Sequence, residues 1–253
     1  MRIDRPDPLS YKRAMPQRPH LSIVVPAYNE EIRLVPTLDR LVEWTEQQSF
    51  RSEIIVVDDG SKDDTCGLVR TYAAKHPHIT LLENGANRGK GFSVGHGVSR
   101  AEGELILFSD ADLSTPIEEF TKLESARGEN DVAIGSRAKP DSQLEQRQPF
   151  YREGMGRTFN FLVRTLVFPG INDTQCGFKL FRADAAKRIF ALRRIDGFAF
   201  DVEILFIARR MNLSVVEIPI TWRNDEASRV HPIKHSLQML RDILRVRHLH
   251  RDL

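Results

Sequence analysis

The feature that most constrains this chain is a regular alternation of short apolar runs with longer amphipathic stretches. The runs, rich in Val, Ile, Leu and Phe, recur between residues 21 and 135. They predict strands at Leu21–Val25, Glu53–Val57, Ile79–Leu82, Glu104–Phe108 and Asp131–Ile134, with helices near 36–48, 62–75, 90–101 and 116–126. Such an alternation is typical of an α/β fold, in which helices flank both faces of a mainly parallel sheet.

The rest of the chain predicts a smaller set of elements. Residues 137–152 are polar and contain proline, as a mobile loop does. The periodicity then predicts an amphipathic helix at 153–168, another helix at 199–211, a strand at 215–222 and a basic C-terminal helix at 233–248. We interpret residues 1–19 as a polar arm and residues 20–253 as a single domain, because this length can bury one large core.

Composition narrows the partners and the compartment. Thirty-seven Lys and Arg against 35 Asp and Glu leave a net charge of +2, so the chain as a whole is no nucleic-acid binder and any basic surface is local. Two cysteines, Cys66 and Cys176, make no disulfide framework and fit a reducing compartment. No run approaches the roughly 18 apolar residues of a membrane span, and the N-terminus has no apolar signal core. We expect a cytoplasmic protein.

Polar residues directly follow three of the expected strands. They are Pro26–Glu30, Asp58–Ser61 and Asp110–Asp112. Since ligands of parallel sheets bind beyond the carboxyl ends of the strands, we expect these clusters to converge on one rim. The alternative for any single cluster is a turn or a helix cap.

Asp110 and Asp112 suit a hard divalent cation. Proteins hold Mg²⁺ with one or two carboxylates while substrate phosphates supply further oxygens. Such a metal would neutralise the charge that develops on a departing diphosphate. Oxygen ligands suit Mn²⁺ as well as Mg²⁺, so the choice between them stays open.

The glycine-rich segment at 87–95 admits two interpretations. Its G-x-G-x-x-x-G pattern, with Asp110 about 20 residues further on, is also found in nicotinamide-dependent oxidoreductases. Against that class, residues 83–88 separate the glycines from the strand, and the segment follows the third strand rather than the first. Arg88 and Lys90 instead suit the oxygens of a nucleotide diphosphate.

A series of motifs resembles family-2 inverting glycosyltransferases of the GT-A fold. The motifs are VVPAYNE (24–30), VVDDGS (56–61), NRGKG (87–91), SDADLSTP (109–116) and GSR (135–137). Three more motifs are similar to the dolichyl- or polyprenyl-phosphate sugar synthases, especially their dolichyl-phosphate β-glucosyltransferase branch: DTQCGFKLF (173–181), FAFDVEIL (198–205) and VVEIPITW (215–222). The resemblance spans residues 20–248.

The resemblance implies a nucleotide-sugar donor, UDP-glucose or GDP-mannose, and a polyprenyl or dolichyl phosphate acceptor. Donor-binding positions that it implies are Pro26, Tyr28, Glu30, Asp58, Lys90, Asp110 and Arg229, with Asp110 and Asp112 at the metal. Arg229 stands where Lys is usual, which keeps the charge and changes the geometry. Ser114 stands where the mannosyl branch often has Gln, which favours glucose over mannose.

The acceptor side of the resemblance implies that Arg137 and Arg152 hold the lipid phosphate. A phosphate monoester, with a second pKa of about 6, is largely dianionic at neutral pH and needs little general base. Its obstacle is repulsion from the anionic donor, which bidentate arginines relieve. Direct displacement then inverts the anomeric carbon. The alternative for Arg137 is an ordinary surface salt bridge.

Asp201 also has two interpretations. It is a catalytic-site residue, acting as base if the acceptor is a sugar hydroxyl, or it caps the helix that begins at Val202. We expect the site role. A glycosyltransferase with a hydroxyl acceptor, and a nucleotide-binding module without catalysis, therefore remain as alternative functions.

Two stretches suggest peripheral contact with the inner face of a membrane. Residues 154–168 place aromatic side chains beside arginines, as interfacial helices do, although core helices share the pattern. Residues 234–251 add a basic face that suits an anionic leaflet, with a solvated face or a dimer contact as alternatives. The oligomeric state stays open.

Overall fold

The computed structural model describes residues 18–144, 170–223 and 232–253. The predictions for the polar arm up to residue 17, for the helix at 153–168, and for Arg152 and Arg229 lie outside the described residues.

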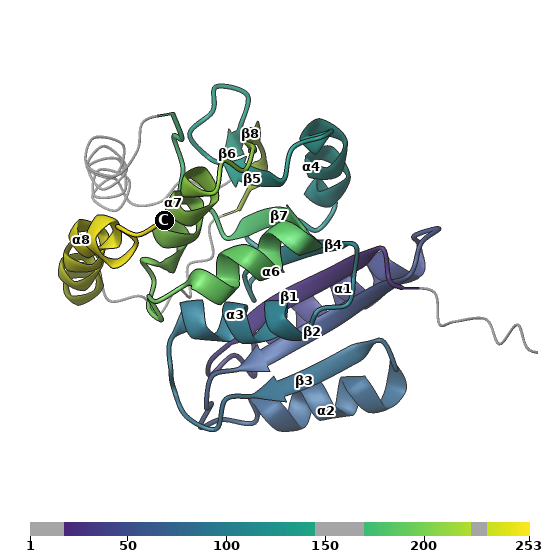
Figure 1. Cartoon of the computed structure of the whole chain (residues 1–253). Coiled ribbons are helices and arrows are strands. Elements are labelled where there is room, and N and C mark those ends of the chain that lie inside the picture. Colours follow the sequence, from purple (N-terminus) through teal and green to yellow (C-terminus); the bar gives the residue numbers. More distant parts are fainter. Residues whose placement is uncertain (1–17, 145–169, 224–231) are drawn as a thin grey trace, which may run out of the picture.

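A central sheet has the strand order β3-β2-β1-β4-β7-β5-β8 (Figure 1). Parallel pairing joins β1 to β2 and β4, β2 to β3, and β5 to β8, whereas β7 lies antiparallel between β4 and β5. The expected mainly parallel sheet is confirmed. The strands are β1 (Leu21–Ala27), β2 (Ser52–Asp58), β3 (Ile79–Glu83), β4 (Leu105–Ser109), β5 (Val132–Ser136), β7 (Phe178–Arg182) and β8 (Val215–Pro219).

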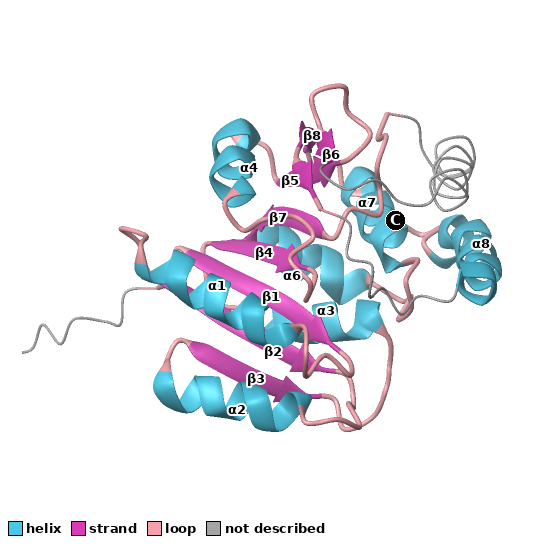
Figure 2. Ribbon diagram, turned by 180° about the vertical axis from the view of Figure 1, so that it is seen from behind, coloured by secondary structure: helices cyan, strands magenta, loops and turns pink. Residues whose placement is uncertain are grey.

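Helices cover both faces of this sheet (Figures 1 and 2). One face carries α1 (Leu34–Glu46), α2 (Thr65–Lys75) and α4 (Glu119–Arg127), whose buried side chains join one apolar cluster. The other carries α3 (Lys90–Arg100), α6 (Ala183–Leu192), α7 (Phe200–Arg210) and α8 (Pro232–Leu249), which join a second cluster.

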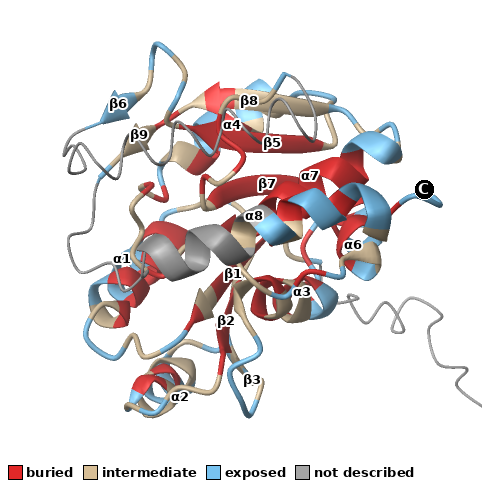
Figure 3. Ribbon diagram, turned by 90° about the vertical axis from the view of Figure 1, so that its left-hand side faces the viewer, coloured by how far each residue is buried: buried red, intermediate tan, exposed pale blue. Residues whose placement is uncertain are grey.

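The strands supply both clusters because successive side chains point to opposite faces. Val24 belongs to the cluster under α3, for example, and its neighbours Ile23 and Val25 to the cluster under α1. Figure 3 shows the resulting buried strands in the middle of the molecule. Strands buried on both faces explain why the sequence shows continuous apolar runs rather than an alternation of polar and apolar residues.

The second half of the chain departs from the predicted elements. No element was predicted for β7 or α6, and β7 is a short strand that carries a lysine and passes into α6 without turn residues. The single strand predicted at 215–222 is wrong: β8 ends at Pro219, which lacks an N–H, and Thr221–Trp222 form β9 in a separate pair. Its partner there is β6 (Gln143–Leu144), within the predicted loop.

No helix among the described residues combines the length and the apolar character that crossing a membrane requires.

Candidate active site

The polar clusters meet at one edge of the sheet, as predicted from their places after the strands. β1, β2 and β4 end at this edge, and so does β5, because both β4 and β5 are antiparallel to β7. The turn 173–177 reaches the same edge, since the antiparallel β7 starts there. The site is therefore built from five strands.

Asp58 closes the end of β2. Its Oδ2 accepts hydrogen bonds from the backbone N–H groups of Gly60 (2.9 Å) and Ser61 (3.0 Å). The side chain is buried, and its Oδ1 has no hydrogen bond of normal geometry among the described residues. The thiol of Cys66 interacts with this carboxylate, but an S–H is a weak donor, so Oδ1 is suited to an N–H group of a bound nucleobase.

Asp59, which the sequence analysis did not single out, holds the glycine segment in place. Its Oδ1 accepts from the backbone N–H of Arg88 (2.9 Å) and its Oδ2 from that of Gly89 (2.8 Å). The two loops pack backbone to backbone, since a Cβ on Gly60 would lie 2.6 Å from the carbonyl carbon of Ala86. The adjacent acids of the VVDDGS motif thus have different tasks.

The other residues after β1 lie beside this turn. Pro26 pairs with Val57 one residue before the end of β1, and Tyr28 is 38% exposed. Glu30 is paired with Arg33, whose Nη2 lies 2.5 Å from Oε1. The same arginine reaches towards the metal motif, with Nη1 4.0 Å from Oδ2 of Asp112. Arg33 is a second contact residue that the sequence analysis missed.

Lys90 and the two aspartates form a compact charged group. Lys90 opens α3, and its Nζ lies 2.6 Å from Oδ1 of Asp110. Burial lowers the pKa of Lys90, but the carboxylates of Asp110 and Asp201 outweigh that effect and raise it. Burial, and then the charge of Asp110, raise the pKa of Asp112.

The residues present fit a divalent cation that shares its ligands with a substrate. Two carboxylates, Asp110 and Asp112, repel each other, and a cation between them would reverse the rise in the pKa of Asp112. Within the described ranges, no group of three or more His, Cys, Asp or Glu side chains could hold a metal alone. A two-carboxylate set is what Mg²⁺ uses when phosphates complete its shell.

Gly177 explains why the downstream motif needs a glycine beside this group. A Cβ there would lie 1.9 Å from Oδ2 of Asp110. The backbone N–H of Asp110 also donates to the carbonyl of Gly177 at 3.1 Å. The turn before β7 therefore packs directly on the metal motif.

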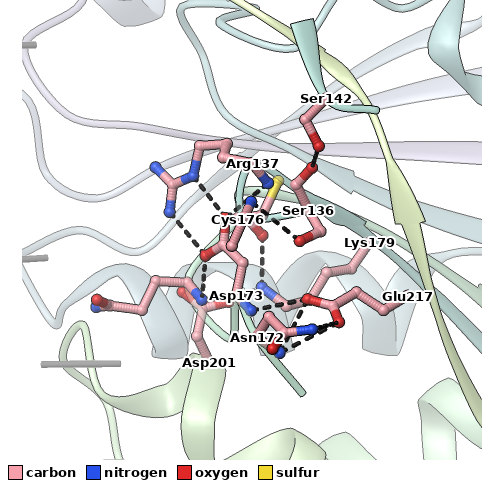
Figure 4. Close-up of polar contacts among 11 residues, drawn as sticks. Ser136, Arg137, Ser142, Asn172, Asp173, Cys176, Lys179, Asp201 and Glu217 are labelled. Atoms are coloured by element: carbon pink, nitrogen blue, oxygen red, sulfur yellow. Dashed lines mark hydrogen bonds and ion pairs between the residues drawn. The ribbon is translucent and has the colours of Figure 1, made fainter. Parts of the chain in front are cut away.

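Arg137 follows β5 and is held by Asp173 (Figure 4). The guanidinium donates from Nε to Oδ2 (2.7 Å) and from Nη2 to Oδ1 (2.8 Å). Asp173 is buried, whereas the side chain of Arg137 is 29% exposed. The Trp222 ring lies 5.5 Å from its Cζ. Arg137 therefore does make a salt bridge, as the alternative held, but the pair is bidentate and its acid is buried, unlike a weak exposed pair. Its role at the acceptor stays a prediction.

Glu217 of β8 holds the turn that carries Asp173 (Figure 4). The carboxylate accepts from the backbone N–H groups of Asn172 (3.0 Å) and Asp173 (2.8 Å), and from Nδ2 of Asn172 (2.9 Å). Arg137 is thus oriented by a chain of contacts across three strands.

Asp201 does not cap α7. The helix begins at Phe200 with Ala199 in the capping position and no side-chain hydrogen bond there, so the capping interpretation is wrong. The carboxylate instead lies 2.5 Å from Nζ of Lys179, which is fully buried and also donates to the carbonyl of Cys176 (Figure 4). Burial raises the pKa of Asp201, and the charges of Lys179 and Lys90 oppose that rise.

The structure therefore brings most of the predicted site residues together. The charge of Asp110 contributes to raising the pKa values of four of them, Lys90, Asp112, Arg137 and Asp201. Lys179 and Asp173 lie within the motif DTQCGFKLF, but the sequence analysis gave neither residue a role, because their partners Asp201 and Arg137 lie far along the chain.

The family model described as glycosyl transferase family 2 matches residues 22–190. The chain belongs to this family. Among its relatives is the dolichyl-phosphate beta-glucosyltransferase of Dictyostelium discoideum, 41% identical over 241 residues that cover 90% of this chain and 74% of the relative. The Homo sapiens protein of that name is 39% identical over 246 residues, again covering 90% and 74%.

Solved structures share the fold. Mannosyl-3-phosphoglycerate synthase from Rubrobacter xylanophilus has a TM-score of 0.69 at 17% identity, covering 93% of this chain and 76% of that one. Glucosyl-3-phosphoglycerate synthase from Mycobacterium tuberculosis, in complex with Mn²⁺, UDP and glucosyl-3-phosphoglycerate, has a TM-score of 0.67 at 17% identity, covering 90% and 80%. The expected GT-A fold is confirmed.

Proposed function

We propose that this chain transfers glucose from UDP-glucose to a dolichyl or polyprenyl phosphate, with inversion at the anomeric carbon. The observation that carries the proposal is the meeting of a cation-binding carboxylate pair, Asp110 and Asp112, with an oriented guanidinium, Arg137, at one rim of the sheet. Relatives named dolichyl-phosphate beta-glucosyltransferase, 32% to 41% identical over nearly the whole chain, support this choice of sugar and acceptor.

The donor lies along the ends of β1, β2 and β4. Oδ1 of Asp58 accepts a nucleobase N–H, while Pro26, Tyr28 and Glu30 line the nucleoside. Lys90 contributes positive charge to the diphosphate from the start of α3. Arg229 is proposed at the same ligand from the sequence resemblance alone.

One divalent cation, Mg²⁺ or Mn²⁺, would be held by Asp110 and Asp112. When bound, it supplies neutralisation of the charge on the departing nucleoside diphosphate. Lys90 stays beside Asp110 and keeps a second positive charge at the leaving group.

The acceptor phosphate meets the edge of Arg137 that does not face Asp173. Asp173 fixes the direction of the guanidinium, so Arg137 loses little freedom when it binds the phosphate. Arg152 is proposed as the second phosphate ligand from the sequence resemblance.

The displacement needs no proton transfer. An oxygen of the phosphate dianion forms a bond to the anomeric carbon, and the bond from that carbon to the diphosphate oxygen breaks with its electron pair on the leaving group. Asp201, engaged with Lys179, therefore acts as a positioning residue that balances the buried lysine charge, rather than as a base. We infer that the enzyme works at the surface of the membrane that contains the lipid acceptor.

Radiolabelled sugar transfer to a short polyprenyl phosphate tests the proposal. UDP-glucose and GDP-mannose are compared with Mg²⁺ or Mn²⁺, and again after chelation. We expect a metal-dependent lipid product from UDP-glucose and none from GDP-mannose. A product from GDP-mannose alone would move the enzyme to the mannosyl branch. Metal-dependent UDP-glucose binding without a lipid product would favour a hydroxyl acceptor with Asp201 as base.

A further inference from the structure

The glycines of the segment 87–95 face the loop between α6 and α7, residues 193–199, which we call the α6–α7 loop. At three of these glycines an added Cβ would lie 3.1 Å or closer to an atom of the loop: Gly89, Gly91 and Gly95. The shortest of these distances, 2.5 Å, is from Gly89 to the carbonyl oxygen of Asp196. Glycine permits such a close approach because it has no Cβ. The spacing of the glycines therefore matches a contact with the α6–α7 loop.

Four backbone N–H groups of the segment already have acceptors within the protein. Those of Gly91 and Phe92, in the first turn of α3, both donate to the carbonyl of Asp196, at 2.7 and 3.3 Å. The two residues before Lys90 donate theirs to the carboxylate of Asp59. Helix N-termini that bind phosphate use such N–H groups. A diphosphate beside this segment would therefore meet the side chain of Lys90 rather than these N–H groups.

Two charged residues hold the α6–α7 loop in its shape. Arg193, whose side chain is 10% exposed, donates from Nη1 to the carbonyl of Ile195 and to Oδ1 of Asp196, both at 2.6 Å. The fully buried carboxylate of Glu203 in α7 accepts from the backbone N–H groups of Arg194 and Ile195, both at 2.8 Å. Because the carbonyl of Asp196 accepts from the first turn of α3, the shape of the loop sets the position at which that helix begins.

We propose that Arg193 is a positioning residue of the donor site, which fixes the α6–α7 loop against α3 and so holds Lys90 at the donor diphosphate. Lys90 is the first residue of α3, and its Nζ lies 2.6 Å from Oδ1 of Asp110. A charge-assisted hydrogen bond weakens steeply when its geometry departs from the optimum. A helix start that the loop no longer holds would therefore bind the diphosphate less well. The diphosphate as the ligand of Lys90 rests on the proposed function.

Nucleotide binding to the full chain tests the proposal. UDP is compared with uridine, which lacks the diphosphate, in the presence of Mg²⁺. The variant is Arg193→Met, and its matched control is Arg188→Met, which removes the same charge and side chain from an exposed position of α6. We expect Arg193→Met to bind UDP about fivefold more weakly and uridine within about 1.5-fold of the wild type. The control should bind both ligands like the wild type.

A Lys90→Met background separates positioning from a general loosening of the fold. Lys90→Met alone should weaken UDP binding about 30-fold, the size of a hydrogen bond to a charged group. Since Arg193 acts through Lys90, adding Arg193→Met should change UDP binding by less than about twofold more. A further loss of about fivefold in that background would overturn the proposal. So would equal losses for UDP and uridine, or a loss for UDP no larger than that of the control.

If Arg193→Met melts early, Gly91→Ala replaces it. Its methyl group would press on the α6–α7 loop from the side of α3 without a change in charge, because a Cβ there would lie 2.7 Å from the carbonyl oxygen of Ile195. Gly128→Ala is the control, since a Cβ at that position meets no atom within 4 Å. We expect a loss of about fivefold for UDP in Gly91→Ala and none in the control. Equal UDP binding by the two variants would overturn the proposal.

Glucose transfer to a short polyprenyl phosphate separates this proposal from the proposed function. A wild type that makes no lipid product, but whose UDP binding depends on Lys90 and Arg193 as expected, would overturn the transfer reaction and leave the positioning role standing. A Lys90→Met variant that binds UDP as tightly as the wild type would overturn the place of Lys90 at the donor, and the positioning role with it.

Discussion

The two sides of the sheet hold their charged residues in different ways. On the β1, β2 and β4 side, Asp58 and Asp112 make hydrogen bonds to backbone groups two or three residues further along the chain. On the β5, β7 and β8 side, charged groups pair with partners far along the chain: Arg137 with Asp173 and Lys179 with Asp201. Asp59 and the Lys90–Asp110 pair also join distant segments on the first side. The difference lies in exposure: Lys90 and Asp110 are 22% and 33% exposed to a ligand, whereas Lys179 and Asp201 are almost fully buried and hold the fold together.

The comparison predicts that activity and stability separate on the first side. Asp110→Asn removes half of the cation-binding pair, and we expect turnover to fall about 10³-fold, the size seen when one electrostatic contact to the transition state is lost. Stability should change little, because the lost pair with Lys90 is partly exposed and the variant also relieves the repulsion of Asp112. Glucose transfer and the melting temperature measure the two effects.

Asp184→Asn serves as the matched control for this variant. It removes an exposed acid paired with Arg182, and both its turnover and its melting temperature should resemble the wild type. If Asp110→Asn also lowered the melting temperature well below that of Asp184→Asn, the charges of the first side would be needed for stability, as those of the second are.

On the second side, Lys179→Met should lower the free energy of unfolding by about 3–5 kcal/mol, since it leaves the buried carboxylate of Asp201 without its partner. Removing both charges in Lys179→Met/Asp201→Leu should recover at least half of that loss, because apolar groups replace a buried pair at little cost. Urea unfolding of the wild type, both single variants and the double variant gives the coupling. Additive losses would show that the two residues do not act as a pair.

Sequence reasoning succeeded where the signal is local. The buried strands are recognisable in the sequence as apolar runs. The acids Asp58 and Asp110 follow such runs, and they lie at the rim because parallel strands end there. Lys90 came from the glycine-rich segment and the family resemblance, and the structure places it at the start of α3.

It failed where a residue's task depends on a distant partner. From the sequence alone, Lys179 resembles an exposed residue of a weak strand. In the fold it is buried in β7, and Asp201 of α7 neutralises its charge. His250 has Asp252 two residues further along the chain, yet the acid it contacts is Glu203 of α7, 47 residues away. The position of Lys179 in the sheet depends on the antiparallel insertion of β7 between β4 and β5, which no local sequence pattern predicts.

The pH dependence of stability sharpens the same comparison through Asp173. Burial raises the pKa of this carboxyl, but the neighbouring Arg137 outweighs it and holds the pKa below its ordinary value. A depressed pKa contributes stability above the unfolded value of about 3.9 and loses it as the pH falls through the folded value. At pH 7, Asp173→Asn should cost about 3 kcal/mol, since it leaves Arg137 without its partner.

The difference between the wild type and Asp173→Asn should therefore shrink as the pH falls below about 4. Asp112 and Asp201 have raised pKa values, so their contribution to stability changes with pH in the opposite sense. Both residues are present in the wild type and in the variant, so their contribution cancels in the difference. Chemical unfolding at a series of pH values measures it. A difference that stays constant down to the acid transition would mean that Asp173 is not ionised beside Arg137.

The smallest effect is expected at Asp58, where only one oxygen is reserved for the ligand. Asp58→Asn can keep one acceptor for the backbone N–H groups of Gly60 and Ser61 through its amide oxygen, while Oδ1 is replaced by an NH₂ that repels a nucleobase N–H. We expect the KM for UDP-glucose to rise about tenfold, which corresponds to about 1.4 kcal/mol, with kcat nearly unchanged. The matched variant Asp59→Asn should behave differently, because Asp59 holds the glycine segment that carries Lys90, so that kcat falls as well. Equal effects on KM and kcat in the two variants would show that the adjacent acids share one task, and that the rim of the first side is as interdependent as the buried pairs of the second.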